Sequence, residues 1–335
     1  MCGPLAAYNP HMMRSSRCLG TSVVAGVLLV SAACGKKAAP PPTAAAGAVA
    51  DAGPGPATAD KKVVQPRPLT KADSKPGPAA NGRNPLLELG AAVGKPVAGA
   101  RGRFVLRYQG PDSETRAMVR QAGVFEKIMP QLNQSLRLPR DIGVSFADCD
   151  EPNAFYDADA VAITVCNEYV DYYGELFSEF PADDARDAIL GSLVSTFLHE
   201  AGHALIHQLE LPTVGREEDV ADQLSTVILI ASGDEGNAMA IDGAYAFIAE
   251  DEADGEETPY WDEHALDQQR FYNTVCLIYG SDPDGWDELV GDDDLPDERA
   301  DQCPDEYQQI STAWNRLLAP YLTVPTVRMT LAKDR

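Results

Sequence analysis

The chain has 335 residues, of which 44% are hydrophobic, so it is long enough for one sizeable folded domain with extensions. Its net charge is −24, and the imbalance lies in residues 101–335, where 16 basic and 47 acidic side chains give −31. This acidic body excludes nucleic-acid binding through a basic face, because phosphate backbones attract positive charge. We therefore expect no nucleic-acid partner.

The N-terminal stretch, residues 1–33, has the pattern of a bacterial secretion signal. Arg14 and Arg17 precede an apolar run at 23–30 that is too short to span a membrane, and small residues come directly before Cys34. These features predict a lipoprotein-type signal peptide, with Cys34 as the lipidated residue. The mature protein would then be a cell-envelope protein, anchored to a membrane through its N-terminal lipid. Simple secretion is the alternative, because the lipidation box departs from its usual pattern.

Residues 34–98 form the next segment, and their composition predicts a disordered tether. Eleven prolines fall among alanines and glycines, and no periodic pattern of apolar residues is present. A segment of this kind cannot bury a core, so we expect it to be extended. It would hold a folded domain, residues 99–335, away from the membrane surface.

Strand patterns come first in the folded domain, and helical patterns follow them. Ser113 can cap the first helix, and Pro130 should kink or interrupt it. This order predicts an α+β domain, with a small N-terminal β-sheet followed by a mainly helical part. The predicted strands cover 104–108, 142–146 and 161–165, and the predicted helices cover 113–136, 167–180, 183–209, 218–232, 237–251, 262–279 and 305–318.

The five residues 199–203 read His-Glu-Ala-Gly-His and fall inside the longest helical pattern. Positions four apart share a helix face, so His199 and His203 can bind one metal ion while Glu200 stands beside them to take a proton from water. This spacing is the zinc-hydrolase signature. Gly202 leaves room for an element that packs closely against the helix. The alternative is a polar stripe in which each histidine is hydrogen-bonded and no metal is held.

A second helix should follow after a short connector at 211–215, and the two helices should then lie antiparallel. Folding that hairpin brings Glu218 level with His203 and Asp222 level with His199. Glu218 is then placed to be the third metal ligand. Asp222 is placed to accept the second ring N–H of His199, which a metal-bound histidine usually donates to such a partner.

The neighbouring acids Glu217 and Asp219 are alternatives for the third ligand. Glu218 is preferred because only it has an acid four residues further on, at Asp222. The whole acidic cluster could also be a solvated helix start, where negative side chains interact favourably with the helix dipole.

The pattern His199-Glu200-x-x-His203 followed by Glu218-x-x-x-Asp222 resembles the gluzincin group of zinc metallopeptidases. The resemblance implies that one zinc ion is bound by the two histidines and Glu218. It also implies that Glu200 is the catalytic base and that Asp222 supports a histidine. A peptide or protein would be the substrate.

A wider stretch, residues 149–284, resembles a bacterial family of metallopeptidases known as domain-of-unknown-function family 4344. The resemblances imply a zincin-like metallopeptidase domain, in which an upstream edge strand often lines the cleft and pairs with an extended peptide. The strand predicted at 161–165 is the candidate, and a plain internal strand is the alternative. The segments that carry the family resemblance are 197–206, 215–219 and 262–280.

A polar and aromatic cluster begins at Tyr260 and contains His264, the only histidine after the motif helix. A peptidase stabilises the oxyanion of its tetrahedral intermediate with a hydrogen-bond donor, for which Tyr260, His264 and Arg270 are candidates. We favour His264 as the catalytic residue, and expect it to share a helix face with Gln268. An ordinary surface helix with an Asp267–Arg270 ion pair is the alternative.

Seven cysteines are present, of which two lie in the predicted signal peptide and one is the predicted lipidation site. The remaining four, an even number in an oxidising compartment, predict two disulfides. We favour Cys149–Cys166 and Cys276–Cys303, because each pair closes a short segment. Free buried thiols are the alternative.

Taken as a sequence, the chain is most consistent with a zinc-dependent peptidase that hydrolyses peptide bonds with a metal-activated water. A different class of protein remains as the alternative, namely a tethered envelope lipoprotein that binds metal without turnover. A structural lipoprotein without metal is the third hypothesis.

Overall fold

The computed structural model of the protein describes residues 101–254, 260–291, 294–327 and 329–330. The predicted signal peptide, Cys34 and the predicted tether lie outside the described residues, so their structure stays a prediction.

A four-stranded β-sheet in the order β1-β2-β4-β3 forms one side of the domain. The first three strands in that order are parallel, and β3 is antiparallel to β4. Ile142, Val144 and Phe146 are buried and alternate with half-exposed neighbours, so one face of the sheet packs on the core. The strands are β1 (Phe104–Tyr108), β2 (Ile142–Ala147), β3 (Ala154–Asp157) and β4 (Ala162–Cys166).

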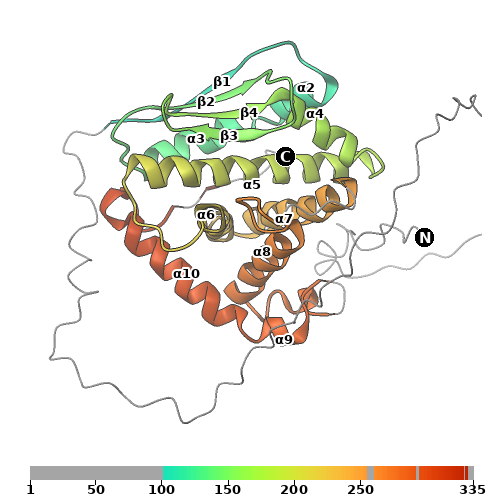
Figure 1. Cartoon of the computed structure of the whole chain (residues 1–335), viewed down its shortest axis with the longest axis vertical. Helices are drawn as coiled ribbons and strands as arrows, with labels where there is room; N and C mark the ends of the chain where they lie inside the picture. Colours follow the sequence, from blue (N-terminus) through green and yellow to red (C-terminus); the bar gives the residue numbers. More distant parts are fainter. Residues whose placement is uncertain (1–100, 255–259, 292–293, 328, 331–335) are drawn as a thin grey trace, which may run out of the picture. The chain divides into compact units, whose positions relative to one another are not determined.

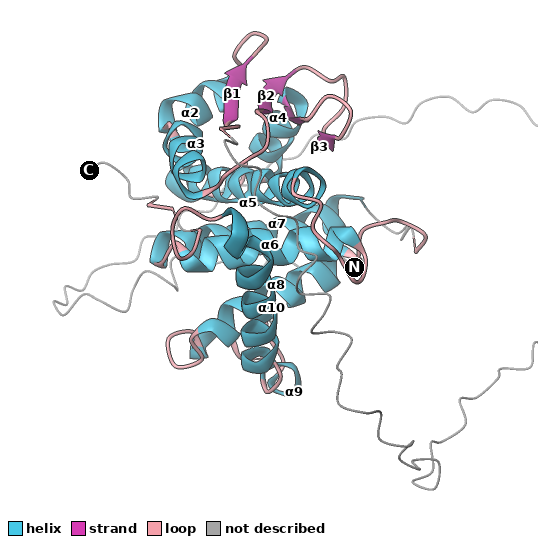
Figure 2. Cartoon of the chain, turned by 90° about the vertical axis from the view of Figure 1, so that its left-hand side faces the viewer, coloured by secondary structure: helices cyan, strands magenta, loops and turns pink. Residues whose placement is uncertain are grey.

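Helices make up most of the remaining chain, which confirms the α+β prediction. Figure 2 shows the sheet and helices α2 to α4 on one side of α5, and helices α6, α8 and α10 on the other side. The helices are α2 (Glu114–Ala122), α3 (Val124–Ser135), α4 (Asn167–Leu176), α5 (Ala182–Gln208), α6 (Glu217–Ala231), α7 (Asp234–Asp254), α8 (Asp267–Ser281), α9 (Asp297–Ala300) and α10 (Cys303–Leu318).

Helix α5 runs through the middle of the domain, between the sheet and the later helices (Figure 1). Its 27 residues are apolar on nearly every side and are mostly buried. Phe197 packs edge-on against Phe104 of β1 and Phe125 of α3, with ring centroids 6.2 and 5.8 Å apart. The helix is long and apolar enough to cross a membrane, but 83% of its most apolar window is buried inside the domain.

Two helices, α2 and α3, replace the single helix predicted at 113–136. The break is at Gly123, whose φ of 63° lies in the left-handed region that glycine adopts without strain. Ser113 caps α2 as predicted, because its hydroxyl accepts a hydrogen bond from the Arg116 N–H. Pro130 lies inside α3 and does not interrupt that helix.

The strand predicted at 161–165 is β4, and its proposed place at the sheet edge is wrong. It lies between β2 and β3, so the alternative of an internal strand is correct. Val161 precedes the strand with a φ of 53°, in a turn. The strand at this edge of the sheet is β3, and β1 lies at the opposite edge. The sequence does not reveal β3, because four residues give too short an alternation to recognise.

The two predicted disulfides, Cys149–Cys166 and Cys276–Cys303, are both confirmed. The first joins the segment before β3 to the last residue of β4, and the second joins α8 to α10. Each of the four sulfurs is therefore part of a disulfide bond and is not a thiolate ligand for a metal.

Candidate metal centre

Helix α5 presents the motif residues to the start of helix α6, which packs against it. A Cβ atom added to Gly202 would lie 3.1 Å from the Cα atom of Ala221, so the glycine allows the two backbones to approach. Further along, the Ser225 hydroxyl donates to the Ser195 carbonyl. Later residues of α6 thus meet earlier residues of α5, and the two helices run in opposite directions where they touch.

Three predicted ligand atoms converge at this contact. The Nε2 atoms of His199 and His203 are 3.1 Å apart, and Oε2 of Glu218 lies 3.1 Å from each of them. Two ligands of a tetrahedral zinc ion with bonds of about 2.0–2.1 Å are roughly 3.3 Å apart. The triangle therefore has the size that a bound metal ion requires.

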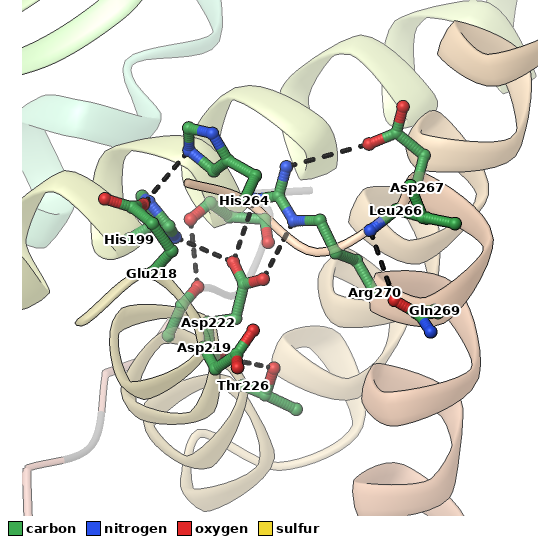
Figure 3. A network of polar contacts seen from close by, with 12 residues as sticks. His199, Glu218, Asp219, Asp222, Thr226, His264, Leu266, Asp267, Gln269 and Arg270 are labelled. Carbon is green, nitrogen blue, oxygen red and sulfur yellow. Dashed lines mark hydrogen bonds and ion pairs between the residues drawn. The ribbon is translucent and has the colours of Figure 1, made fainter. Parts of the chain in front are cut away.

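The hydrogen-bond partners of both histidines turn their Nε2 atoms toward the triangle. Nδ1 of His199 lies 2.7 Å from Oδ1 of Asp222, and Nδ1 of His203 lies 2.8 Å from Oε1 of Glu217. An ionised carboxylate can only accept, so each Nδ1 atom carries a hydrogen and each Nε2 atom faces the triangle. A cation, either a proton or a metal ion, can therefore lie between the two Nε2 atoms. Figure 3 shows the arrangement around His199, Glu218 and Asp222.

The charges of the site also favour a cation. Burial alone would lower the pKa of His199, but the charge of Asp222 and its hydrogen bond outweigh burial and raise that pKa to about 9. Burial likewise opposes ionisation of Glu218, yet hydrogen bonds from His199, His203 and His264 hold the pKa of its carboxyl far below the usual range. The triangle thus attracts positive charge, which protons supply in the absence of a metal and a metal ion would supply by displacing them.

Glu200 stands beside the triangle and is 7% exposed. It lines a cavity of about 190 Å³ together with His199 and His264. Burial is the main cause that raises the pKa of the Glu200 carboxyl. A buried carboxylate with a raised pKa, next to a metal-sized set of ligands, is suited to accepting and returning a proton.

The structure brings His264 to the site but leaves Tyr260 outside it. Nε2 of His264 lies 3.0 Å from Oε2 of Glu218. Tyr260 is 81% exposed and does not line the cavity. The prediction that His264 and Gln268 share a helix face is wrong. Helix α8 begins only at Asp267, and His264 lies in the connection before it.

Arg270 holds Asp222 and is not a free oxyanion donor. Its Nε and Nη2 atoms donate to the two carboxylate oxygens of Asp222 at 2.9 and 3.0 Å (Figure 3), and its guanidinium lies 4.0 Å from the centre of the Phe247 ring. Arg270 also forms the ion pair with Asp267 that the sequence suggests, with Nη1 3.8 Å from Oδ1 of Asp267. A chain of contacts therefore runs from Arg270 through Asp222 to His199.

The two alternative candidates for the third ligand, Glu217 and Asp219, have other partners. Glu217 accepts from Nδ1 of His203, as described above, and Asp219 pairs with Arg216 at 3.2 Å. The role of Glu217 as a partner of His203 was missed. Its only sequence signal is its position directly before Glu218, which does not distinguish a ligand from a ligand's partner.

The α+β fold and this group of two histidines and a glutamate define a candidate metalloprotein. The sequence profile of a family described as "Putative metallopeptidase", domain of unknown function 4344, matches residues 108–318. This is more than half of the chain, so the chain belongs to that family, as the resemblance in the sequence predicted. No curated protein and no solved structure matches the chain.

The close contact at Gly202 leads to a stability prediction. Replacing Gly202 with valine should force α5 and α6 apart and lower the free energy of unfolding by about 1–3 kcal/mol, the usual effect of overpacking. Metal affinity should fall as well, because the ligands come from both helices. Urea denaturation and a zinc titration measure the two effects. Gly291→Val is the control, since nothing lies within 4 Å of a Cβ at that position. Equal stability of the two variants would contradict the prediction.

Proposed function

We propose that the protein is a zinc-dependent peptidase with a zincin-like domain. The observation that carries the proposal is the convergence of His199, His203 and Glu218, whose ligand atoms all lie within 4.8 Å of one another, beside the buried Glu200. Two imidazoles and one carboxylate are a donor set that suits zinc and leaves a position open for water. Membership of a metallopeptidase family supports the same reaction.

The chemistry follows from the side chains around the cavity. A zinc ion bound by the three ligands would supply Lewis acidity, which makes a water molecule more acidic and polarises the substrate carbonyl. Glu200 takes the proton of the attacking water and returns it to the leaving amine. His264, at the cavity wall, donates a hydrogen bond to the oxyanion that develops on the carbonyl oxygen. Asp262 accepts a hydrogen bond from Nδ1 of His264 at 3.0 Å, so Nε2 is the atom that would donate to the oxyanion, in place of its contact with Glu218.

We place the peptide along β3, the edge strand next to the cavity. Asn153 and Ala154, at the start of that strand, line the cavity together with Glu200. Among the described residues β3 pairs only with β4, and its other edge would pair with main-chain groups of an extended peptide. The sequence suggested residues 161–165 as the strand that pairs with the peptide, and we now propose β3 for that role.

Metal analysis and an activity assay test the proposal together. The purified protein should hold one equivalent of zinc and cleave members of a peptide library. A chelator should abolish cleavage, and added zinc should restore it. His203→Ala should lose both zinc and activity. His207→Ala is the control, since His207 contacts Tyr156 and not the ligand triangle.

The alternative function gives a different result in the same assay. A tethered envelope lipoprotein without turnover would hold one equivalent of zinc and leave every peptide intact. Export, lipidation at Cys34 and a membrane anchor belong to this proposal under either function, and mass spectrometry of the N-terminal peptide from membranes checks them.

A further inference from the structure

The cavity beside Glu200 extends along α5 away from the metal ligands. Ser192, Ser195 and Thr196 lie one and two turns before Glu200 on the same side of the helix, and all of them line the cavity. Its volume of about 190 Å³ is below the roughly 300–1,000 Å³ of pockets that hold a whole small-molecule ligand. It has the size for one long side chain of a peptide whose backbone lies at Glu200.

The far wall of this cavity carries hydroxyl groups, and a buried carboxylate that does not itself line the cavity lies behind them. The hydroxyls of Tyr169 and Tyr173, both on α4, lie 2.6 Å apart, and Thr196 hydrogen-bonds to the same pair. The Tyr169 hydroxyl donates to Oε1 of Glu250 at 3.0 Å. Glu250 comes one turn after Phe247 on α7, and Phe247 itself lines the cavity.

No lysine or arginine among the described residues that line the cavity is committed to Glu250. Among the described residues that line the cavity, Arg270 is the only lysine or arginine, and two of its nitrogens are held by Asp222. Burial is the largest cause that raises the pKa of Glu250 to about 7, and Asp267 of α8 raises it further, while Tyr169, Tyr173 and Arg270 oppose the rise. A cation in the cavity would favour the ionised form of this carboxyl.

We propose that this cavity is a subsite for a basic side chain, lysine or arginine, of the peptide substrate, and that Glu250 is the acidic residue that selects it. This inference rests on the proposed peptidase function and names the substrate class. The long stem of a basic side chain packs against Phe247 and Ala154, and its charged end reaches the hydroxyls of Tyr169 and Tyr173 in front of Glu250. The charge of −31 on residues 101–335 attracts basic peptides in the same sense.

Cleavage-site profiling tests the selectivity. Zinc-loaded full-length protein is incubated with a peptide library, and mass spectrometry identifies the residues next to each cut bond. Lysine and arginine should be enriched at one of these positions. Glu250→Gln should lower kcat/KM for matched lysine peptides by about tenfold or more, the scale of losing one partner of a buried ion pair, and leave norleucine peptides unchanged.

Glu252→Gln is the matched control, since it removes the same charge from an exposed position of the same helix. It should cleave both kinds of peptide as the wild type does. A wild-type profile without basic enrichment overturns the proposal whether or not the Glu250 variant folds. An equal loss on lysine and norleucine peptides in Glu250→Gln also overturns it.

A binding measurement separates this inference from the proposed function. Agmatine carries the guanidinium of arginine and needs no turnover, so calorimetry with the zinc-loaded protein probes the cavity alone. Suppose that the wild-type protein binds agmatine, that Glu250→Gln weakens this binding about tenfold, and that the wild type cleaves no peptide. This result supports the subsite and refutes the peptidase. Peptide cleavage without basic preference, with equal agmatine binding to both proteins, refutes the subsite and supports the peptidase.

Discussion

Replacing Glu200 with glutamine should lower peptide hydrolysis by about 10²–10⁴-fold, the usual contribution of a positioned acid–base group. Glutamine keeps the size of the side chain in its buried position but cannot take the water proton. The two histidines and Glu218 are untouched, so the variant should still bind one equivalent of zinc. Activity on a peptide library and elemental analysis of the same preparation measure both quantities.

Asp219→Asn is the control for Glu200→Gln, because Asp219 is an acid close to the site whose partner is Arg216. It should retain wild-type activity. If Glu200→Gln cleaved peptides at the wild-type rate with its zinc in place, Glu200 would not be the base, and another residue of the cavity would have to take that role.

Removing Asp222 should have the largest effect on stability. Asp222→Ala leaves the Arg270 guanidinium, whose side chain is 15% exposed, without its carboxylate, and leaves Nδ1 of His199 without an acceptor. Breaking a buried ion pair by removing one partner lowers the free energy of unfolding by about 3–5 kcal/mol. Urea denaturation at neutral pH measures this loss, and zinc affinity should fall with it, since His199 is no longer oriented.

A double variant identifies the cause of that loss. Asp222→Ala combined with Arg270→Met removes both charges, so it should recover part of the stability that the single variant loses. Recovery of zinc affinity is not expected, because His199 still lacks its acceptor. If the single and double variants unfold at the same urea concentration, the unpaired guanidinium is not the source of the instability.

The parts of the site that the sequence predicts are those built from short-range geometry. His199, Glu200 and His203 are placed by the helical repeat alone. Glu218 and Asp222 are placed by one helix hairpin, whose connector starts eight residues after His203. Both relations depend on residues fewer than 25 positions apart. The disulfide pairing was accessible for the same reason, since each bond closes a segment of 17 or 27 residues.

Long-range contacts could not be predicted in this way. Arg270 lies 48 positions after Asp222, and no local pattern connects a guanidinium on one helix to a carboxylate on another. The position of β3 at the sheet edge depends on strand pairing and not on the composition of its four residues. The break at Gly123 was missed for a different reason, since the apolar pattern continues across it and only the glycine marks the end of the helix.

The burial of α5 couples metal binding to the stability of the whole folded domain. The helix that carries His199 and His203 also supplies Phe197 to the hydrophobic core, so it cannot be released to solvent by the opening of one loop. Loss of the histidines from their positions therefore accompanies global denaturation. A ligand at 100 times its Kd stabilises the native state by about 2.7 kcal/mol, and here that gain applies to the whole domain. The melting temperature thus serves as a readout of zinc loading, even in the absence of any substrate.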